Sequence, residues 1–307
     1  MCAVAGGPSV RYLDAERKAV TTLLRLFRGY PHLPAARITG PVGYCGRVST
    51  LSDLGRDALL VAGGGRAILL QIANPSVGRG VAAHSDFASR PLDRLHSTLT
   101  YVYAQAFGTE TDKRAVTRQV NRAHAPVSSE ATVGTPSYSA FDPALQLWVA
   151  ATLYDTAVTV HELVYGPLAS DAADQIYRDY AVLGTALQMP EELWPDTREQ
   201  FGHYFDSEIA KLKVTREALA VSRELLAGRA LSPVLRAMMP LVRLVTAGLL
   251  DPRLRAMYGF RWSQRQQRRF DRVIGVVRVI WPKLPRGIRF GLCSFYLWKL
   301  RRGINSH

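Results

Sequence analysis

The segment 142–166, DPALQLWVAATLYDTAVTVHELVYG, limits the possible folds more than any other part of the sequence. Asp142 followed by Pro143 is a strong helix start, because an aspartate side chain caps free backbone amides and proline is tolerated at the first helical position. The residues that follow are mostly apolar on every side of the predicted helix. A helix without a clear polar face is normally central in a large bundle. The segment therefore predicts an all-α protein.

Apolar residues at helical spacing recur along the chain and predict further helices. They are expected at 14–28, 52–62, 91–108, 111–126, 170–187 and 196–228, and as several short helices after a break near Pro233. We find no alternating strand series and no internal repeat. The sequence predicts a single large domain of about 9–12 helices. Its expected parts are a helix and loop at 1–50, a core at 51–230, and a basic helical region at 231–307 that packs on the same domain.

The net charge of +14 is concentrated in the last quarter of the chain. Residues 231–307 hold 16 of the 39 Lys and Arg residues but two of the 25 acids, so the first 230 residues carry no net charge. Such a block attracts phosphates of lipid or nucleic acid. Segment 283–302, KLPRGIRFGLCSFYLWKLRR, mixes aromatic residues with cations, which suits a helix lying on an anionic membrane. In the alternative, the aromatics pack into the domain and the arginines are solvated. Nucleic acid, through RWSQRQQRRF at 261–270, is the less favoured partner.

Cysteine usage and hydropathy predict a reducing compartment. Cys2, Cys45 and Cys293 lie far apart without a CxxC pair, which argues against a disulfide framework and a structural zinc site. The N-terminus has no basic segment followed by an apolar one, and no run of 18 uncharged apolar residues occurs. We therefore expect a cytoplasmic protein that can also lie on a membrane surface.

Several familiar motifs are incomplete. AGGGRA at 62–67 fits neither dinucleotide-binding nor phosphate-loop spacing, and a flexible helix–helix junction is the better interpretation. His161-Glu162 begins a zinc-protease motif, but Tyr165 stands where its second histidine belongs. His84, in AAHSDF, has two interpretations: a helix end followed by a turn capped by Ser85 or Asp86, or a histidine held near a pocket.

Two further polar sites lie on predicted helices. Arg94, Thr98, Tyr101 and Gln105 share one stripe, so a guanidinium and a hydroxyl one turn apart can meet one acceptor such as a carboxylate. The alternative is a solvated face. His124 shares an apolar stripe with Val116, Val120 and Val127, opposite Lys113, Arg114, Arg118 and Arg122. Periodicity leaves it either a hydrogen-bonded core histidine or a ligand.

Taken together, three stretches resemble one family. They are LLQIANPSVGRGVAAHSDFASRPLDRLHSTLTYVYAQAFGT, then NRAHAPV, then YSAFDPALQLWVAATLYDTAVTVHELVYGPL. Their order and spacing resemble the bacterial MpaB-type oxygenases, which share a catalytic domain with latex-clearing protein (rubber oxygenase). The resemblance covers roughly residues 50–260. It implies a helical fold that encloses a b-type haem, with His124 as the iron ligand and the Arg94–Thr98 pair near the haem.

The same resemblance carries departures that bear on the chemistry. Many relatives have His-Pro where this chain has Asn74-Pro75, and a histidine where it has Ala150. No acid here matches the carboxylate base of rubber oxygenase, and His84 is the nearest polar candidate. The leading hypothesis is a haem-dependent oxygenase or peroxidase-like oxidoreductase that uses O2 or peroxide on a hydrophobic substrate. The alternative is a helical haem- or lipid-binding protein at the membrane surface without turnover.

Overall fold

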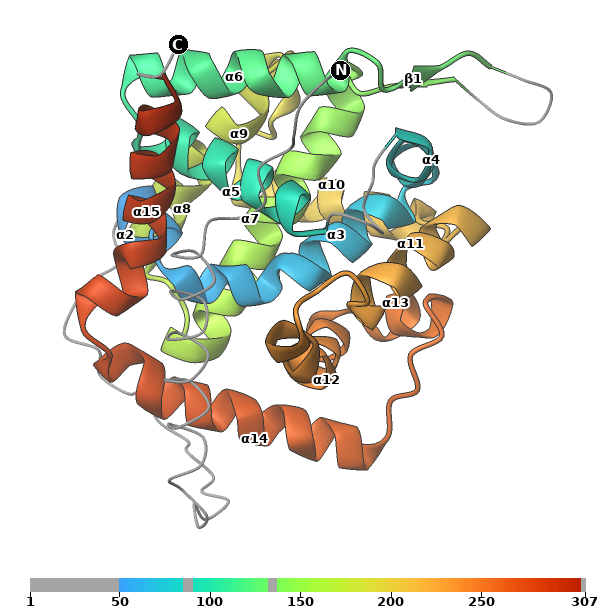
Figure 1. Cartoon of the computed structure of the whole chain (residues 1–307), viewed down its shortest axis with the longest axis vertical. Helices are drawn as coiled ribbons and strands as arrows, with labels where there is room; N and C mark the ends of the chain where they lie inside the picture. The colour runs from blue at the N-terminus through green and yellow to red at the C-terminus, as the bar shows by residue number, and fades with distance from the viewer. Residues whose placement is uncertain (1–49, 85–90, 132–136, 305–307) are drawn as a thin grey trace, which may run out of the picture.

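A computed structural model of the chain describes residues 50–84, 91–131 and 137–304. The predicted helix at 14–28 and the turn at Ser85 and Asp86 lie outside these residues. The described chain is helical apart from a short antiparallel pair of strands, so the all-α prediction is confirmed. Figure 1 shows the helices gathered around α7 (Pro143–Tyr165).

The elements follow one another along the chain with short connections. In order they are α2 (Leu51–Gly55), η1 (Ala58–Gly63), α3 (Gly64–Ala73), α4 (Pro75–His84), α5 (Pro91–Phe107), α6 (Glu110–His124), β1 (Ser128–Ser129), β2 (Tyr138–Ser139), α7, α8 (Ser170–Tyr180), α9 (Val182–Thr185), η2 (Glu191–Leu193), α10 (Arg198–Lys211), α11 (Arg216–Ala227), α12 (Pro233–Leu249), α13 (Pro252–Met257), α14 (Gln264–Ile280), η3 (Trp281–Lys283) and α15 (Arg286–Ile304).

Helix α7 forms as the sequence predicts. The Asp142 side chain accepts hydrogen bonds from the backbone amides of Ala144 (2.8 Å) and Leu145 (3.4 Å). Buried residues occur around the whole helix, including Trp148, Ala151 and Val160. The helix contacts η1, α3, α9 and α14, so neighbours surround it.

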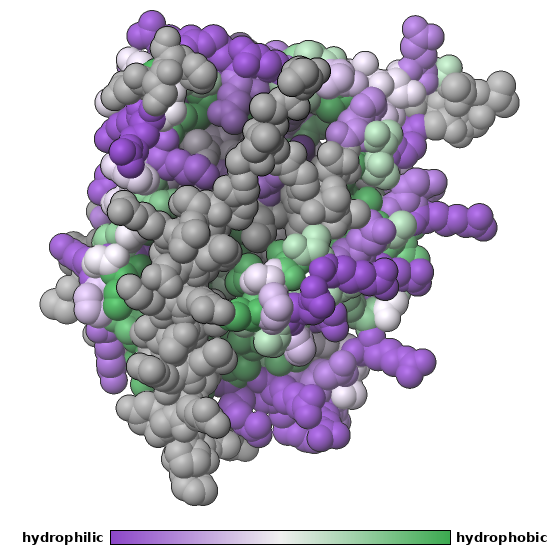
Figure 2. All heavy atoms as spheres, viewed as in Figure 1, coloured by the Kyte–Doolittle hydropathy of each residue, from purple (hydrophilic) through white to green (hydrophobic). Residues whose placement is uncertain are grey.

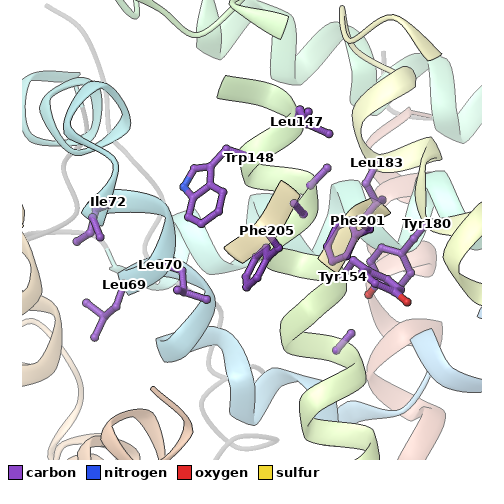
Figure 3. Close-up of a cluster of buried hydrophobic side chains, with 14 of the residues drawn as sticks. Leu69, Leu70, Ile72, Leu147, Trp148, Tyr154, Tyr180, Leu183, Phe201 and Phe205 are labelled. Atoms are coloured by element: carbon purple, nitrogen blue, oxygen red, sulfur yellow. The ribbon is translucent and has the colours of Figure 1, made fainter. Parts of the chain in front are cut away.

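The core beside α7 is rich in aromatic rings (Figure 3). Phe201 of α10 lies edge-on to Tyr154 with ring centroids 4.9 Å apart, and it stacks on Phe205 at 5.7 Å. Phe205 in turn stacks on Trp148 at 5.5 Å. Each such pair contributes about 0.5–1.5 kcal/mol beyond the burial of its area. This aromatic cluster holds α10 against α7.

Three predicted helix boundaries are wrong, for reasons outside the local sequence. The predicted helix at 52–62 ends at Arg56, because the Asp57 side chain caps the separate helix η1. The predicted helix at 196–228 is interrupted where the Lys213 amide donates to the Ala73 carbonyl oxygen at 3.0 Å. Residues after 233 form three long helices, α12, α14 and α15, beside the short α13, and Pro240 lies inside α12.

The glycines of AGGGRA lie at a tightly packed junction between η1 and α3. A Cβ atom on Gly63 would lie 2.5 Å from a methyl of Thr156 on α7, and one on Gly65 would overlap the Thr246 side chain on α12. The next residue, Arg66, forms an ion pair with Asp155 at 2.6 Å. The glycines therefore allow three helices to approach one another. The helix–helix junction is confirmed, but it is tightly packed and does not support the flexibility that was predicted for it.

The basic C-terminal helices contact the rest of the fold. Helix α12 packs on α3 and η1, α14 on α7, and α15 on α5 and η1. Hydrophilic side chains gather along the lower edge of the view, where α14 runs, and along α6 at the top (Figure 2). Among the residues that the structure describes, no helix is both long and apolar enough to cross a bilayer.

Candidate cofactor site at His124

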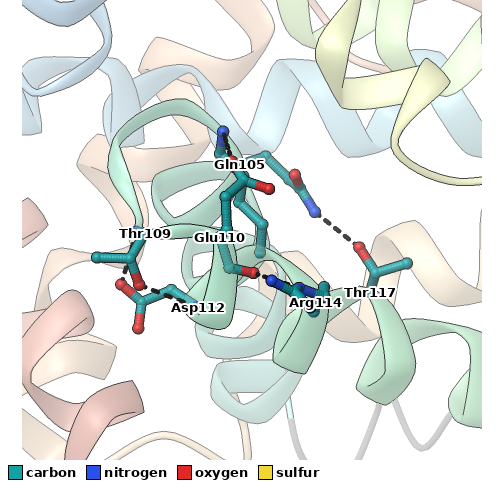
Figure 4. Close-up of polar contacts among 7 residues, drawn as sticks. Gln105, Thr109, Glu110, Asp112, Arg114 and Thr117 are labelled. Atoms are coloured by element: carbon teal, nitrogen blue, oxygen red, sulfur yellow. Dashed lines mark hydrogen bonds and ion pairs between the residues drawn. The ribbon is translucent and has the colours of Figure 1, made fainter.

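His124 is the last residue of α6, and it faces inward as its spacing predicts. The helix begins with a capping box, in which Thr109 and Asp112 bind each other's backbone amides (Figure 4). Val116 is almost fully buried two turns before His124, whose imidazole is half-buried. The apolar stripe of α6 therefore ends on an imidazole at the edge of the core.

The imidazole of His124 is desolvated and keeps a nitrogen available. Its Nδ1 atom is buried and has no hydrogen-bond partner among the described residues. Phe141, just before α7, lies edge-on to the ring with centroids 6.4 Å apart. Burial, and secondarily the positive charge of Arg94, lower the pKa of His124 to about 4. At neutral pH the ring is therefore uncharged. The hydrogen bonds expected of a core histidine are not made at Nδ1.

Arg94 lies on α5, close enough for its charge to act on His124. Its side chain has exposed surface, yet burial lowers its pKa. The Arg94 side chain is therefore partly in contact with water and partly surrounded by protein. Thr98, one turn further along α5, is half-buried.

The stripe that starts at Arg94 leads into the core. The Tyr101 hydroxyl donates to the Leu183 carbonyl oxygen at 2.9 Å, and Gln105 Nε2 donates to Thr117 Oγ1 at 2.8 Å (Figure 4). Both Tyr101 and Gln105 are buried. The solvated-face interpretation is therefore wrong for this half of the stripe. Arg94 and Thr98 stand at the end of a buried polar row.

His84 ends α4 on an exposed position. Its Nε2 lies 3.1 Å from the Tyr138 hydroxyl of β2, and the two rings meet edge-on. Tyr138 itself is buried, and Arg79 lies over its ring at 5.4 Å. The structure thus gives His84 a partner on the hairpin that follows His124. The role of His84 in a pocket stays a prediction.

The positions that depart from the family pattern have structural uses. Asn74 Oδ1 accepts hydrogen bonds from the amides of Ser76 (3.0 Å) and Val77 (3.3 Å), which caps α4. Ala150 is buried in the middle of α7. Neither position therefore supplies a titratable group: the Asn74 side chain caps a helix, and the Ala150 methyl group lies in the core.

A buried polar cluster around Asp57 escaped the sequence analysis. Asp57 accepts hydrogen bonds from the Tyr165 hydroxyl (2.6 Å), Trp281 Nε1 (2.8 Å) and the Leu59 amide (3.0 Å). Arg289 Nη1 forms an ion pair with the same carboxylate at 3.8 Å. Asp57 and Arg289 are both buried. The one signal in the sequence was Asp57 itself, which stands directly before the apolar residues ALLVA. An acid at this place does not indicate partners more than a hundred residues away.

His161 lies beside this cluster. Its ring centroid is 4.9 Å from that of Tyr165, and burial lowers its pKa to about 4, opposed by the negative charge of Asp57. Burial and the neighbouring Asp57 carboxylate raise the pKa of Tyr165. Its hydroxyl therefore stays protonated and donates a hydrogen bond to the carboxylate. This is the histidine that the incomplete zinc-protease motif contains, and it packs as a core residue.

The fold and the site together define an all-α protein with an uncharged, inward-facing imidazole beside a desolvated arginine. The chain belongs to the family described as ER-bound oxygenase mpaB/B'/Rubber oxygenase, catalytic domain, whose model matches residues 53–279, more than half of the chain. The resemblance inferred from the sequence is thereby confirmed, and the chain carries a catalytic domain of an oxygenase family.

Two curated relatives are similar over most of their length. They are uncharacterised proteins of Mycobacterium bovis and Mycobacterium tuberculosis, each 38% identical over 240 residues, which cover 76% of this chain and 93% of the relative. No solved structure matches the chain.

Proposed function

We propose that the chain binds haem b through His124 and oxidises a hydrophobic substrate with O2 or peroxide. The observation that carries the proposal is the unpaired, buried Nδ1 of an uncharged imidazole. An iron ligand must be a neutral imidazole with a ring nitrogen that is not already hydrogen-bonded. Haem iron bound there would supply the activation of the oxidant.

Arg94 would orient the haem through its carboxylates. A desolvated guanidinium is stabilised by a carboxylate, and the planar fork of arginine can bind it with two hydrogen bonds. Burial already lowers the pKa of Arg94. Thr98, one turn away, would donate its hydroxyl proton to the same group or to a polar atom of the oxidant. His84, whose Nε2 lies 3.1 Å from the Tyr138 hydroxyl, would be the polar side chain that acts on the oxidant.

Helix α7 would supply the apolar wall of the substrate site. Phe141 contacts the His124 ring, and α7 leads from there into the core. Two turns after Phe141, the buried Trp148 presents an indole ring whose Nε1 has no hydrogen-bond partner among the described residues. Leu153, further along, is half-buried. Such a wall would exclude water and accept an apolar molecule.

The test is the absorption spectrum of the full chain after expression with haem supply. We expect a Soret band in the wild type and in His203→Ala, because His203 is exposed on α10. We expect His124→Ala to lose the band. A wild type that does not take up haem, or a His124→Ala variant that retains the band, refutes the ligand. A Soret band without oxygen consumption on apolar substrates favours a haem-binding protein without turnover.

A further inference from the structure

The last helix, α15, has an apolar face that the fold leaves exposed. Ile288, Phe295 and Trp298 are 54%, 37% and 52% exposed. Their spacings of seven and three residues place them on one side of the helix. Three large apolar side chains exposed along one side of a helix are unusual on a surface that faces only water.

The opposite face of α15 is anchored to the fold without using these residues. Arg289 pairs with Asp57, and the Tyr296 ring packs at 5.8 Å from that of Tyr103 on α5. Arg301 donates two hydrogen bonds to Asp112 of α6, at 3.0 and 2.9 Å. These contacts recur from the first turns of α15 to its last. The helix is therefore held in place while its apolar stripe stays outward.

Cations border the exposed stripe. Arg286 and Lys299 are exposed, and the Arg302 guanidinium lies over the Trp298 ring at 4.7 Å. The first half of α14, which lies toward the end of that helix away from α15 (Figure 1), carries further exposed arginines with one acid, Asp271, among them. They are Arg265, Arg268, Arg269 and Arg272. This part of the chain carries the whole excess of positive charge.

We infer that α15 is a docking surface for an anionic phospholipid bilayer, on which it lies parallel to the membrane plane. Aromatic and aliphatic side chains enter the boundary between headgroups and acyl chains, and basic residues contact the anionic headgroups. Charge complementarity selects this occupant. A second copy would bring the same cations together, and a nucleic acid would leave the apolar stripe in water. The inference does not depend on haem.

The experiment is co-sedimentation of the full chain with vesicles of phosphatidylcholine, with and without phosphatidylserine. We expect binding to the anionic vesicles that weakens with salt. Phe295→Ser with Trp298→Ser should lower the binding at least about tenfold, because two exposed rings no longer leave water. Lys299→Gln with Arg302→Gln should lower it roughly 30-fold on anionic vesicles, since each cation near such a surface contributes about fivefold.

The matched control is Leu193→Ser, which removes an apolar side chain of similar exposure, 40%, from η2. It should bind like the wild type, and unchanged far-UV circular dichroism confirms that each variant is folded. The inference is overturned if the wild type does not bind anionic vesicles, or if the double serine variant binds them as well as the wild type. Self-association that the double serine variant loses, without vesicle binding, also overturns it in favour of a second copy.

Discussion

Replacing Asp57 by alanine should be among the most destabilising single substitutions in this protein. The change removes the one carboxylate that accepts from Tyr165 and Trp281 and that faces the Arg289 guanidinium. Because Arg289 is buried, its charge stays in the core without the Asp57 counterion. Breaking one partner of a buried ion pair costs about 3–5 kcal/mol.

The contacts of Asp57 also rank the stability costs of related substitutions. Tyr165→Phe removes the hydrogen bond that the hydroxyl donates to the carboxylate and the one that it accepts from Arg289 Nη1 at 3.2 Å. It leaves the bonds from Trp281 and Leu59 to Asp57, so it should cost about 1.5–3 kcal/mol. Asp53→Ala is the matched control, because Asp53 lies on α2 only four residues away but is exposed. It loses the N3 half of the capping box that Asp53 forms with Thr50, which costs about 1 kcal/mol.

Urea unfolding followed by circular dichroism and tryptophan fluorescence measures these differences, provided that the slope with denaturant is the same in all variants. The reasoning is refuted if Asp57→Ala loses no more free energy of unfolding than Asp53→Ala. It is also refuted if Tyr165→Phe proves worse than Asp57→Ala.

Three further predictions concern the histidines and the glycine junction. Because the folded pKa of His161 is about 4 and the ordinary value is 6.5, the unfolded chain binds more protons between these values, and stability falls as the pH drops through that window. His161 should contribute about 2 kcal/mol to the stability lost between neutral pH and pH 5, beside the contribution of His124, whose pKa is also about 4. His161→Gln should remove its own part of the loss in urea titrations, and an unchanged loss counts against this source. Arg94→Gln removes a positive charge and should raise the pKa of His124 in an NMR titration, whereas Arg94→Lys keeps the charge and should keep the pKa near 4. Equal pKa values in the two variants would contradict the electrostatic contact between Arg94 and His124. Gly65→Ala should cost about 1–3 kcal/mol of stability because the new methyl group overlaps the Thr246 side chain, whereas Gly64→Ala, which has open space, should be nearly neutral. Thermal melts of the two variants measure the difference, and equal costs would contradict the tight packing at Gly65.

The sequence was sufficient for features that depend on local pattern. The start of α7 depends on Asp142-Pro143, and its central place depends on apolar residues all round, both of which are visible in the letters. The inward direction of His124 follows from its spacing to Val116. The breaks at Asp57 and Lys213 could not be predicted, because each depends on contacts with distant residues, such as the Ala73 carbonyl oxygen.

The candidate site was predictable only as a set of positions. Periodicity places Arg94 and Thr98 on one stripe, but it does not show that Tyr101 and Gln105 take that stripe into the core. It also cannot show that Nδ1 of His124 lacks a partner, because this depends on how α5, α6 and the start of α7 meet. Composition also could not show which aromatic residues of segment 283–302 are buried. Tyr296 packs inward, whereas Trp298 is exposed.

The Asp57 cluster also has a consequence for how the chain is made. The carboxylate and its indole partner Trp281 are 224 residues apart. At about 5–20 residues per second, a ribosome needs roughly 10–45 s to pass from one to the other. During that interval η1 has been synthesised but cannot bury its charged cap, and α7 lacks the cover that α14 later provides. During synthesis, the face of α7 that α14 covers therefore stays open until α14 has been made, and apolar side chains exposed in this way promote contacts with other chains.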